Sequence, residues 1–350
     1  MQGQVAIKQF WAQAGLDFQS ALSCVETQLA NLDSKPTNIR IISAGECSMF
    51  TSSIILDFCQ KLAATAPTQF ISAACTSVNA AILDFYHSNE SDCVIIALEL
   101  DRNRQQDCLD ALDIGISRIE DGLDVKPSCG LLQLTRCDKQ QNSSAYYIQD
   151  CQILSQQAGM RGTTNLVKRL SHYIEQSEGQ KVSFAISSKW GLSVLAGVNA
   201  KLSANSNKGQ AWLASAEQGQ SHYLSVKPIL ELQSYHEQLN HSPLLIITLG
   251  GGGRVGLLKL NCTSDEKSQN TTILPQSSFE NHDINQDIDN FNTAIHIKNN
   301  NANNSNLEDS YQLIRTTLKY PRSRYRGLDN HYFKWSLTAA NNTKIGPHHD

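Results

Sequence analysis

Two hydrophobic patterns alternate along the first 260 residues: short continuous apolar runs, and longer stretches with apolar residues at helical spacing. A continuous run indicates a strand that is covered on both faces, because a solvated face would require alternating polar residues. In the first half we expect strands at residues 39–42, 69–74, 93–99 and 130–134. Helices are expected behind a cap at Asp17 and from about Ser53. Strands that alternate with helices indicate an α/β protein with a covered sheet.

A similar order returns in the second half. We expect strands at residues 182–186, 244–249 and 255–260, and helical stretches at 192–202 and 222–232. Pro228 would kink the last helical stretch or mark its true start. Residues 1–150 and 151–262 are therefore predicted to be rough copies of one α/β plan, similar in pattern rather than in sequence.

The character of the chain changes after Cys262. Residues 263–306 are rich in Asn, Gln, Ser and Asp, a composition that buries too little apolar surface to order itself, so we expect a flexible linker. Residues 307–350 begin with a predicted short helix whose apolar face is made by Leu307, Tyr311, Ile314 and Leu318. A basic, aromatic segment follows at 319–326. It is either a docking patch for an acidic carrier or a solvated tail, and we favour the tail because charge runs are weak signals.

Composition excludes several classes of protein. With 350 residues and 40% hydrophobic content the chain fits a globular protein, and a net charge of −4 gives no reason to expect nucleic acid as the main partner. Its ten cysteines form no CxxC pairs near histidines, so neither a disulfide scaffold nor a zinc site is expected. No signal-peptide pattern and no run of about 18 apolar residues is present. A cytoplasmic location with free thiols is the simplest expectation.

The most informative residue is Cys75, which follows the apolar strand and two alanines and precedes a helical pattern. A cysteine at such a junction lies beside unpaired N–H groups and the positive end of the helix dipole. Both favour the thiolate, which lowers the thiol pKa and makes a nucleophile. The competing interpretation is a small buried residue, the usual fate of cysteine. The stretch alone does not decide between the two.

The run from Gly250 to Gly253 contains a G-x-G-x-x-G spacing at Gly251, Gly253 and Gly256. A dinucleotide site would need a helix to open after this loop, but an apolar strand follows, and the Lys-Ser/Thr pair of a P-loop is missing. Nucleotide binding is therefore not expected. A glycine hairpin does allow close backbone approach to a ligand, and its N–H groups can hold an oxyanion.

Taken together, the cysteine junction, the glycine hairpin and the duplicated plan resemble the thiolase superfamily, and within it the ketoacyl synthases. The resemblance covers roughly residues 10–262. Residues 74–77 resemble the family's nucleophile turn, and residues 94–99 resemble its strand ending in Gly-x-Glu, with Ala97 in place of the glycine. Residues 249–256 resemble the glycine hairpin of the initiating, type III branch. The resemblance implies a layered αβαβα fold, Cys75 as nucleophile, and oxyanion donors at the N–H groups of Cys75 and Gly251.

The same resemblance has departures at two catalytic positions. The family's histidine after the first strand of the second half is replaced by Ser187. The third catalytic position is Gln220 when aligned with the type III branch, or His222 when aligned with elongating synthases, and the sequence leaves both alignments open. His222 is equally compatible with a noncatalytic histidine at a helix start. The first strand is predicted to be shortened to residues 4–8 or lost.

These features imply an acyl transfer or condensation through a Cys75 thioester in fatty-acid or polyketide-type biosynthesis. The substrate would be an acyl-CoA or acyl-carrier-protein thioester, with no permanently bound cofactor and no metal. The alternatives are a noncatalytic subunit of a ketosynthase heterodimer, similar to a chain-length factor, and a module that binds a small anion. Dimerisation, with itself or with a ketosynthase, is expected along residues 69–74, because so apolar an edge strand would otherwise be prone to aggregation.

Overall fold

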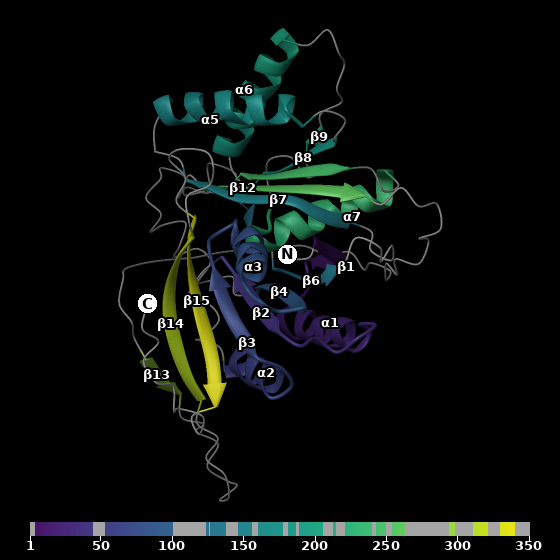
Figure 1. The fold of residues 1–350 in the computed structure, drawn as a ribbon, viewed down its shortest axis with the longest axis vertical. Coiled ribbons are helices and arrows are strands. Elements are labelled where there is room, and N and C mark those ends of the chain that lie inside the picture. Colours follow the sequence, from purple (N-terminus) through teal and green to yellow (C-terminus); the bar gives the residue numbers. More distant parts are fainter. Residues whose placement is uncertain are drawn as a thin grey trace, which may run out of the picture.

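The fold was established from a computed structural model, which describes most of the first 262 residues and three later strands. The described residues are 4–44, 53–100, 124–125, 127–137, 146–155, 160–177, 181–186, 189–205, 213–214, 221–239, 243–249, 254–262, 294–297, 311–320 and 330–339. The chain folds into two α/β halves that lie one above the other in Figure 1.

The first half is one mixed sheet with helices on both faces. Its strands follow the order β3-β2-β4-β6-β1, with β2 parallel to β3 and β4, and β6 antiparallel to β4 and β1. The elements are β1 (Gln4–Ala14), α1 (Phe18–Ala30), β2 (Ile39–Ser43), α2 (Ser53–Ala63), β3 (Thr68–Ser72), α3 (Ser77–His87), β4 (Asp92–Glu99), the short β5 (Asp124–Val125) and β6 (Ser128–Cys137). Asp17 caps α1 as predicted, since its carboxylate accepts the Ser20 N–H at 2.9 Å.

The second half repeats this plan. Its strands follow the order β9-β8-β11-β12-β7, with the same parallel and antiparallel relations. The elements are β7 (Tyr146–Ser155), α5 (Met160–Glu175), β8 (Lys181–Ile186), α6 (Lys189–Asn205), β9 (Leu213–Ala214), β10 (Ser221–His222), the 3₁₀ turn η3 (Leu224–Val226), α7 (Lys227–Leu239), β11 (Leu244–Leu249) and β12 (Arg254–Cys262). Because both strand orders match element by element, α3 and α7 occupy equivalent positions, as do β6 and β12.

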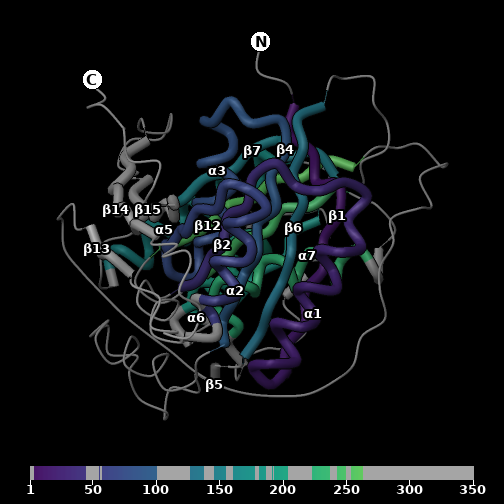
Figure 2. The backbone as a smooth tube through the Cα atoms, turned by 90° about the horizontal axis from the view of Figure 1, so that it is seen from below, coloured from purple at the N-terminus to yellow at the C-terminus, as the bar shows by residue number. Residues whose placement is uncertain are grey.

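The two halves stack into five layers, and their sheets are joined where Ala6 and Ile7 of β1 pair with β7. Helices α3 and α7 lie between the sheets, where Val78 and Ile82 of α3 share a core with Ile229 and Leu232 of α7. Helices α1 and α2 cover the outer face of the first sheet, and the view from below places both in front of it (Figure 2). Helices α5 and α6 cover the outer face of the second sheet. The predicted layered αβαβα arrangement is therefore confirmed.

Two sequence-based boundaries are wrong. Strand β1 is eleven residues long and pairs with β6 along its length, rather than being shortened to residues 4–8, because Phe10, Trp11 and Ala12 are all buried in the sheet. The helical stretch expected at 222–232 begins only at Lys227, after β10 and η3. Pro228 is its second residue and marks its start, where the missing proline N–H is tolerated.

The C-terminal region forms strands that extend the first sheet, and the helix predicted to begin near Leu307 is wrong. Strands β13 (Ala294–Ile297), β14 (Tyr311–Tyr320) and β15 (Asn330–Ala339) form an antiparallel ribbon, and β15 pairs with β3, as Figure 1 shows. Strand β3 is thus not an edge, and a dimer along it would require β15 to be displaced. The linker predicted at 263–306 contains β13, and its other residues lie outside the described ones.

Removal of this ribbon should expose the edge of β3. A chain truncated after residue 310 would lose β14 and β15 and leave the backbone groups of an apolar strand unpaired, so we expect it to self-associate. Light scattering at micromolar concentration measures the mass, with a chain truncated after Ala339 as the matched control. A truncated chain with the same association state as this control would contradict the prediction.

Candidate functional site

Cys75 lies in a strained turn between β3 and α3, which we call the Cys75 turn (residues 73–76). Ala74 has a φ of 51°, in the left-handed region that non-glycine residues rarely adopt, at a cost of about 1–3 kcal/mol. The turn is held by the Thr76 hydroxyl, which donates to the Ala73 carbonyl at 2.6 Å, and by the Ser77 hydroxyl, which accepts the Ala73 N–H at 2.8 Å. Cys75 is 4% exposed. Strain that is so firmly supported points to a functional position.

No other described cysteine shares this placement. Cys24 and Cys59 lie within helices, and the remaining five lie within strands: Cys93, Cys129, Cys137, Cys151 and Cys262. Burial raises the pKa of Cys59, Cys129 and Cys151 well above the ordinary value for a thiol. Burial also raises the pKa of Cys93 to about 12, although Arg40 beside it opposes the shift. Among the described cysteines, Cys75 alone occupies a strand-to-helix junction.

The second half contains a matching turn before α7, which we call the Ser225 turn (residues 223–226). Ala74 stands three residues before the first residue of α3, and Leu224, with a φ of 41°, stands three residues before the first residue of α7. These are the two non-glycine residues with positive φ in the described part of the chain. Cys75 and the buried Ser225 are therefore equivalent positions of the duplicated fold.

His222 lies at the entrance to this second turn. Its backbone belongs to β10, which runs parallel to β5, and η3 follows two residues later. η3 packs against α3, β2 and β4, so the structure brings the His222 segment to the same end of the first sheet as Cys75. His222 is not at a helix start, which corrects that part of the interpretation.

Three candidate residues, Gln220, Ser187 and Gly251, lie outside the described residues. Their flanking strands are described, however. β8 ends at Ile186, directly before Ser187, and β11 ends at Leu249, two residues before Gly251. Ile186 and Leu249 pair in parallel, so both strands end side by side at one edge of the second sheet.

The helix that follows Cys75 is fixed against the second half by Asn79. Its amide donates to the Leu257 carbonyl of β12 at 3.1 Å. A Cβ on Gly256 would lie only 2.3 Å from the Asn79 Oδ1. Gly130, the equivalent residue of β6, faces Ile229 of α7 at 3.2 Å in the same way. Each central helix thus packs on a glycine of the opposite half, because only a residue without a Cβ permits this approach.

The far end of α3 is fixed by two arginines. Arg40 of β2 donates to Asp84 at 2.7 Å, to Glu90 at 2.5 Å and to the Cys93 sulfur at 2.7 Å. Arg136 of β6 donates to the carbonyl groups of Phe85, Tyr86, Ser88 and Glu90, which satisfies the last turn of the helix. Helix α3, which follows Cys75, is therefore held at both ends.

Comparison of sequences finds no family model and no curated protein that matches this chain. Comparison of structures does find matches. The tetronic acid condensing enzyme AbyA1 matches with a TM-score of 0.50 at 9% identity, over 73% of this chain and 99% of that one. AbyA1 is a thiolase-superfamily enzyme of the ketoacyl synthase III type. This chain has a thiolase-like fold.

Two further solved structures match this chain with lower TM-scores. An OleA variant from Xanthomonas campestris matches with a TM-score of 0.48 at 8% identity, over 74% of this chain and 98% of that one. The 3-oxoacyl-(acyl carrier protein) synthase III from Xanthomonas oryzae pv. oryzae matches with a TM-score of 0.45 at 8% identity, over 75% of this chain and 100% of that one.

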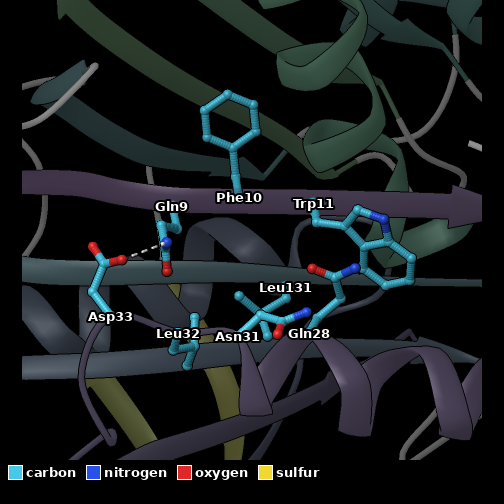
Figure 3. Close-up of a pocket in the computed structure, with 8 residues that line it drawn as sticks. All are labelled: Gln9, Phe10, Trp11, Gln28, Asn31, Leu32, Asp33 and Leu131. Carbon is cyan, nitrogen blue, oxygen red and sulfur yellow. Dashed lines mark hydrogen bonds between the residues drawn. The ribbon is translucent and has the colours of Figure 1, made fainter. Parts of the chain in front are cut away.

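Two pockets among the described residues lie away from Cys75. A cavity of about 290 Å³ lies between α1 and the outer face of the first sheet, where Trp11 and Asn31 line it and Gln9 donates to Asp33 (Figure 3). A smaller one of about 70 Å³ lies between α5 and β7, with Leu257 in its lining. Both fall at equivalent places of the two halves, so we interpret them as gaps of the duplicated thiolase-like fold.

The described residues contain no cluster of three or more His, Cys, Asp or Glu side chains suited to a metal ion. Among the helices within the described ranges, none has the length and apolar character needed to cross a membrane.

Sequence reasoning missed Glu99 as a member of this site. The carboxylate lies at the end of β4, 2% exposed, and accepts the Ala44 N–H at 2.5 Å and the Ser225 hydroxyl. Burial raises its pKa to about 7 against the opposing effect of these donors. The signal available in the sequence was a glutamate that ends an otherwise apolar strand.

Proposed function

We propose that this thiolase-like protein accepts an acyl chain on Cys75 from a coenzyme A or carrier-protein thioester. The Cys75 thiolate would attack the thioester carbonyl carbon, a new C–S bond would form, and the carrier thiolate would leave and take up a proton. The acyl group would then pass to a second acceptor in fatty-acid or polyketide-type biosynthesis.

The observation that carries this proposal is the Cys75 turn. A nucleophile before a helix gains from the N-terminal dipole and from nearby N–H groups, and the strained φ of Ala74 is retained because the turn is hydrogen-bonded on both sides. We further propose that the N–H groups of Cys75 and Gly251 hold the oxyanion, and that His222 or Gln220 serves as the polar partner of the thiolate.

A second candidate is a noncatalytic subunit that pairs with an intact ketosynthase. Ser187 favours it, because a decarboxylative condensation needs polar groups to stabilise the enolate, and the resembled family has a histidine at that position. The small-anion module has less support, since the hairpin of β11 and β12 is integrated into a complete thiolase-like half.

The release of free thiol from a panel of acyl-CoA and acyl-carrier thioesters tests the proposal. The wild-type protein should release thiol from at least one donor in the presence of an alcohol or amine acceptor, which consumes no thiol, and Cys75→Ala should lower the rate by at least about a thousandfold. Equal rates for the two proteins would overturn the proposed function.

Ser187→His separates the enzyme from the noncatalytic subunit. The new imidazole would stand where an enolate needs a donor, so carbon dioxide release from a malonyl thioester should rise at least about tenfold in an active site that lacks only this group. The matched control is Ser187→Ala. No rise, together with no thiol release by the wild type, would favour the noncatalytic subunit.

A further inference from the structure

We infer that Glu99 is a positioning residue that locks the Cys75 turn and the Ser225 turn to each other. The expected effect of Glu99 on acyl transfer rests on the proposed function, whereas its expected effect on the position of Cys75 does not. It begins with the equivalence of the two turns: each has a positive φ three residues before a central helix, and the two belong to opposite halves of the molecule.

Glu99 hydrogen-bonds the Ser225 turn directly, and it also hydrogen-bonds the end of β2 that lies beside the Cys75 turn. On one side it accepts the N–H of Ser225 at 3.3 Å and the Ser225 hydroxyl, both at Oε1. On the other side Oε1 accepts the Ala44 N–H at 2.5 Å, while Oε2 lies 3.2 Å from the Ser43 hydroxyl. One carboxylate oxygen therefore receives donors from both halves of the fold.

The end of β2 transmits this contact to Cys75. The Ser43 carbonyl accepts the Ser77 hydroxyl at 3.0 Å, and the Ala44 carbonyl accepts the Ser72 hydroxyl at 3.0 Å. Ser72 and Ser77 flank the Cys75 turn on its two sides. Glu99 thus reaches the Cys75 turn indirectly, through Ser43 at the end of β2 and Ala44 directly after it.

The cost of this arrangement indicates a role in the site. Burial of a carboxyl group disfavours its charged form, and the pKa of Glu99 rises to about 7 for that reason. Two neutral turns could be joined by apolar packing at lower cost. Small displacements of reacting groups lower reaction rates steeply. A buried acid that links the two strained turns would keep Cys75 in a fixed position.

Iodoacetamide alkylation of Cys75, followed by peptide mass spectrometry, tests the inference independently of any acyl substrate. Glu99→Ala should slow alkylation about tenfold or more and lower kcat for thiol release by a similar factor, with KM little changed. Glu99→Gln retains the Oε1 acceptor and should restore most of both rates.

Two further variants decide between positioning and general stability. Ser225→Ala should slow Cys75 alkylation as well, and Glu99→Ala/Ser225→Ala should be no slower than the slower single variant, because both remove one contact. Asp150→Ala is the matched control, since the Asp150 carboxylate of β7 accepts hydrogen bonds from Gln152 and Tyr173, which belong to neither turn. It should lower Tm yet leave alkylation unchanged.

The inference is overturned if Glu99→Ala alkylates at the rate of Asp150→Ala, or if the effects of Glu99→Ala and Ser225→Ala multiply. It stands, and the proposed function fails, if these alkylation rates change as expected while no thioester yields thiol in the wild type.

Discussion

Arg40→Met should lower the free energy of unfolding by about 3–5 kcal/mol, because it removes the guanidinium from a buried ion pair. Arg40 is 1% exposed and binds Asp84, which is itself buried in α3, together with Glu90. Without the arginine, the Asp84 carboxylate would stay in the interior without its counterion. Urea unfolding, followed by circular dichroism, measures the change.

Lys61→Met is the matched control for Arg40→Met. Lys61 pairs with Glu26 at 3.9 Å, and the two side chains are 75% and 54% exposed, so its loss should cost no more than about 0.5 kcal/mol. Adding Asp84→Asn to Arg40→Met should recover part of the loss, since the stranded charge is removed. Equal stability losses for Arg40→Met and Lys61→Met would contradict the account of α3 as a helix held by buried charge.

Gly256→Ala should lower the free energy of unfolding by about 1–3 kcal/mol and slow the reaction of Cys75. The new Cβ would lie 2.3 Å from Asn79 Oδ1, a distance that forces α3 or β12 to move. Asn79 lies one helical turn beyond Cys75, so a shift of α3 displaces Cys75. Thermal unfolding and the alkylation rate of Cys75 measure the two effects.

Gly130→Ala and Asn79→Ala provide the controls for this contact. At Gly130 the new Cβ would lie 3.2 Å from both the end of the Ile229 side chain and the Trp11 carbonyl oxygen, so its neighbours need to move much less than at Gly256 and the loss should be smaller. In an Asn79→Ala background, Gly256→Ala should cost less than it does in the wild type, because the clashing oxygen is gone. Additive losses would show that Asn79 is not the residue that excludes a Cβ at position 256.

The parts of the fold that could be predicted from sequence are those with a strong local signal. The buried strands β4 and β11 are continuous apolar runs, and the cysteine junction is marked by the change from strand to helical spacing around Cys75. The hairpin at Gly250 to Gly253 could be predicted because an apolar strand follows the glycines. The strands on its two sides, β11 and β12, do pair antiparallel, with Thr248 opposite Gly256.

Elsewhere the spacing of apolar residues predicted the wrong element or left an element unpredicted. Tyr311, Ile314 and Leu318 have helical spacing, yet they lie in the strand β14. Its β-branched residues suit a sheet, and β14 pairs with β15, which in turn pairs with β3. Helix α5 was missed although Leu166 and Leu170 repeat at a spacing of four, since its mean composition is polar.

The contacts that join the two halves could not be predicted from one sequence. Glu99 meets Ser225 across 126 positions of the chain, and Asn79 meets the Leu257 carbonyl across 178. No local sequence pattern indicates which residues meet across such long separations along the chain. They follow from the stacking of the two sheets on α3 and α7, which the sequence indicates only through the repetition of its strand order.

Peptide-mapped mass spectrometry after exposure to acyl thioesters tests the central claim, that Cys75 is the acyl-accepting nucleophile, most directly. We expect the wild-type chain to gain one acyl group that maps to the peptide containing Cys75, and Cys75→Ala to gain none. The same adduct on Cys75→Ala, or one that maps to Cys93 or Cys129 in the wild type, would contradict the claim.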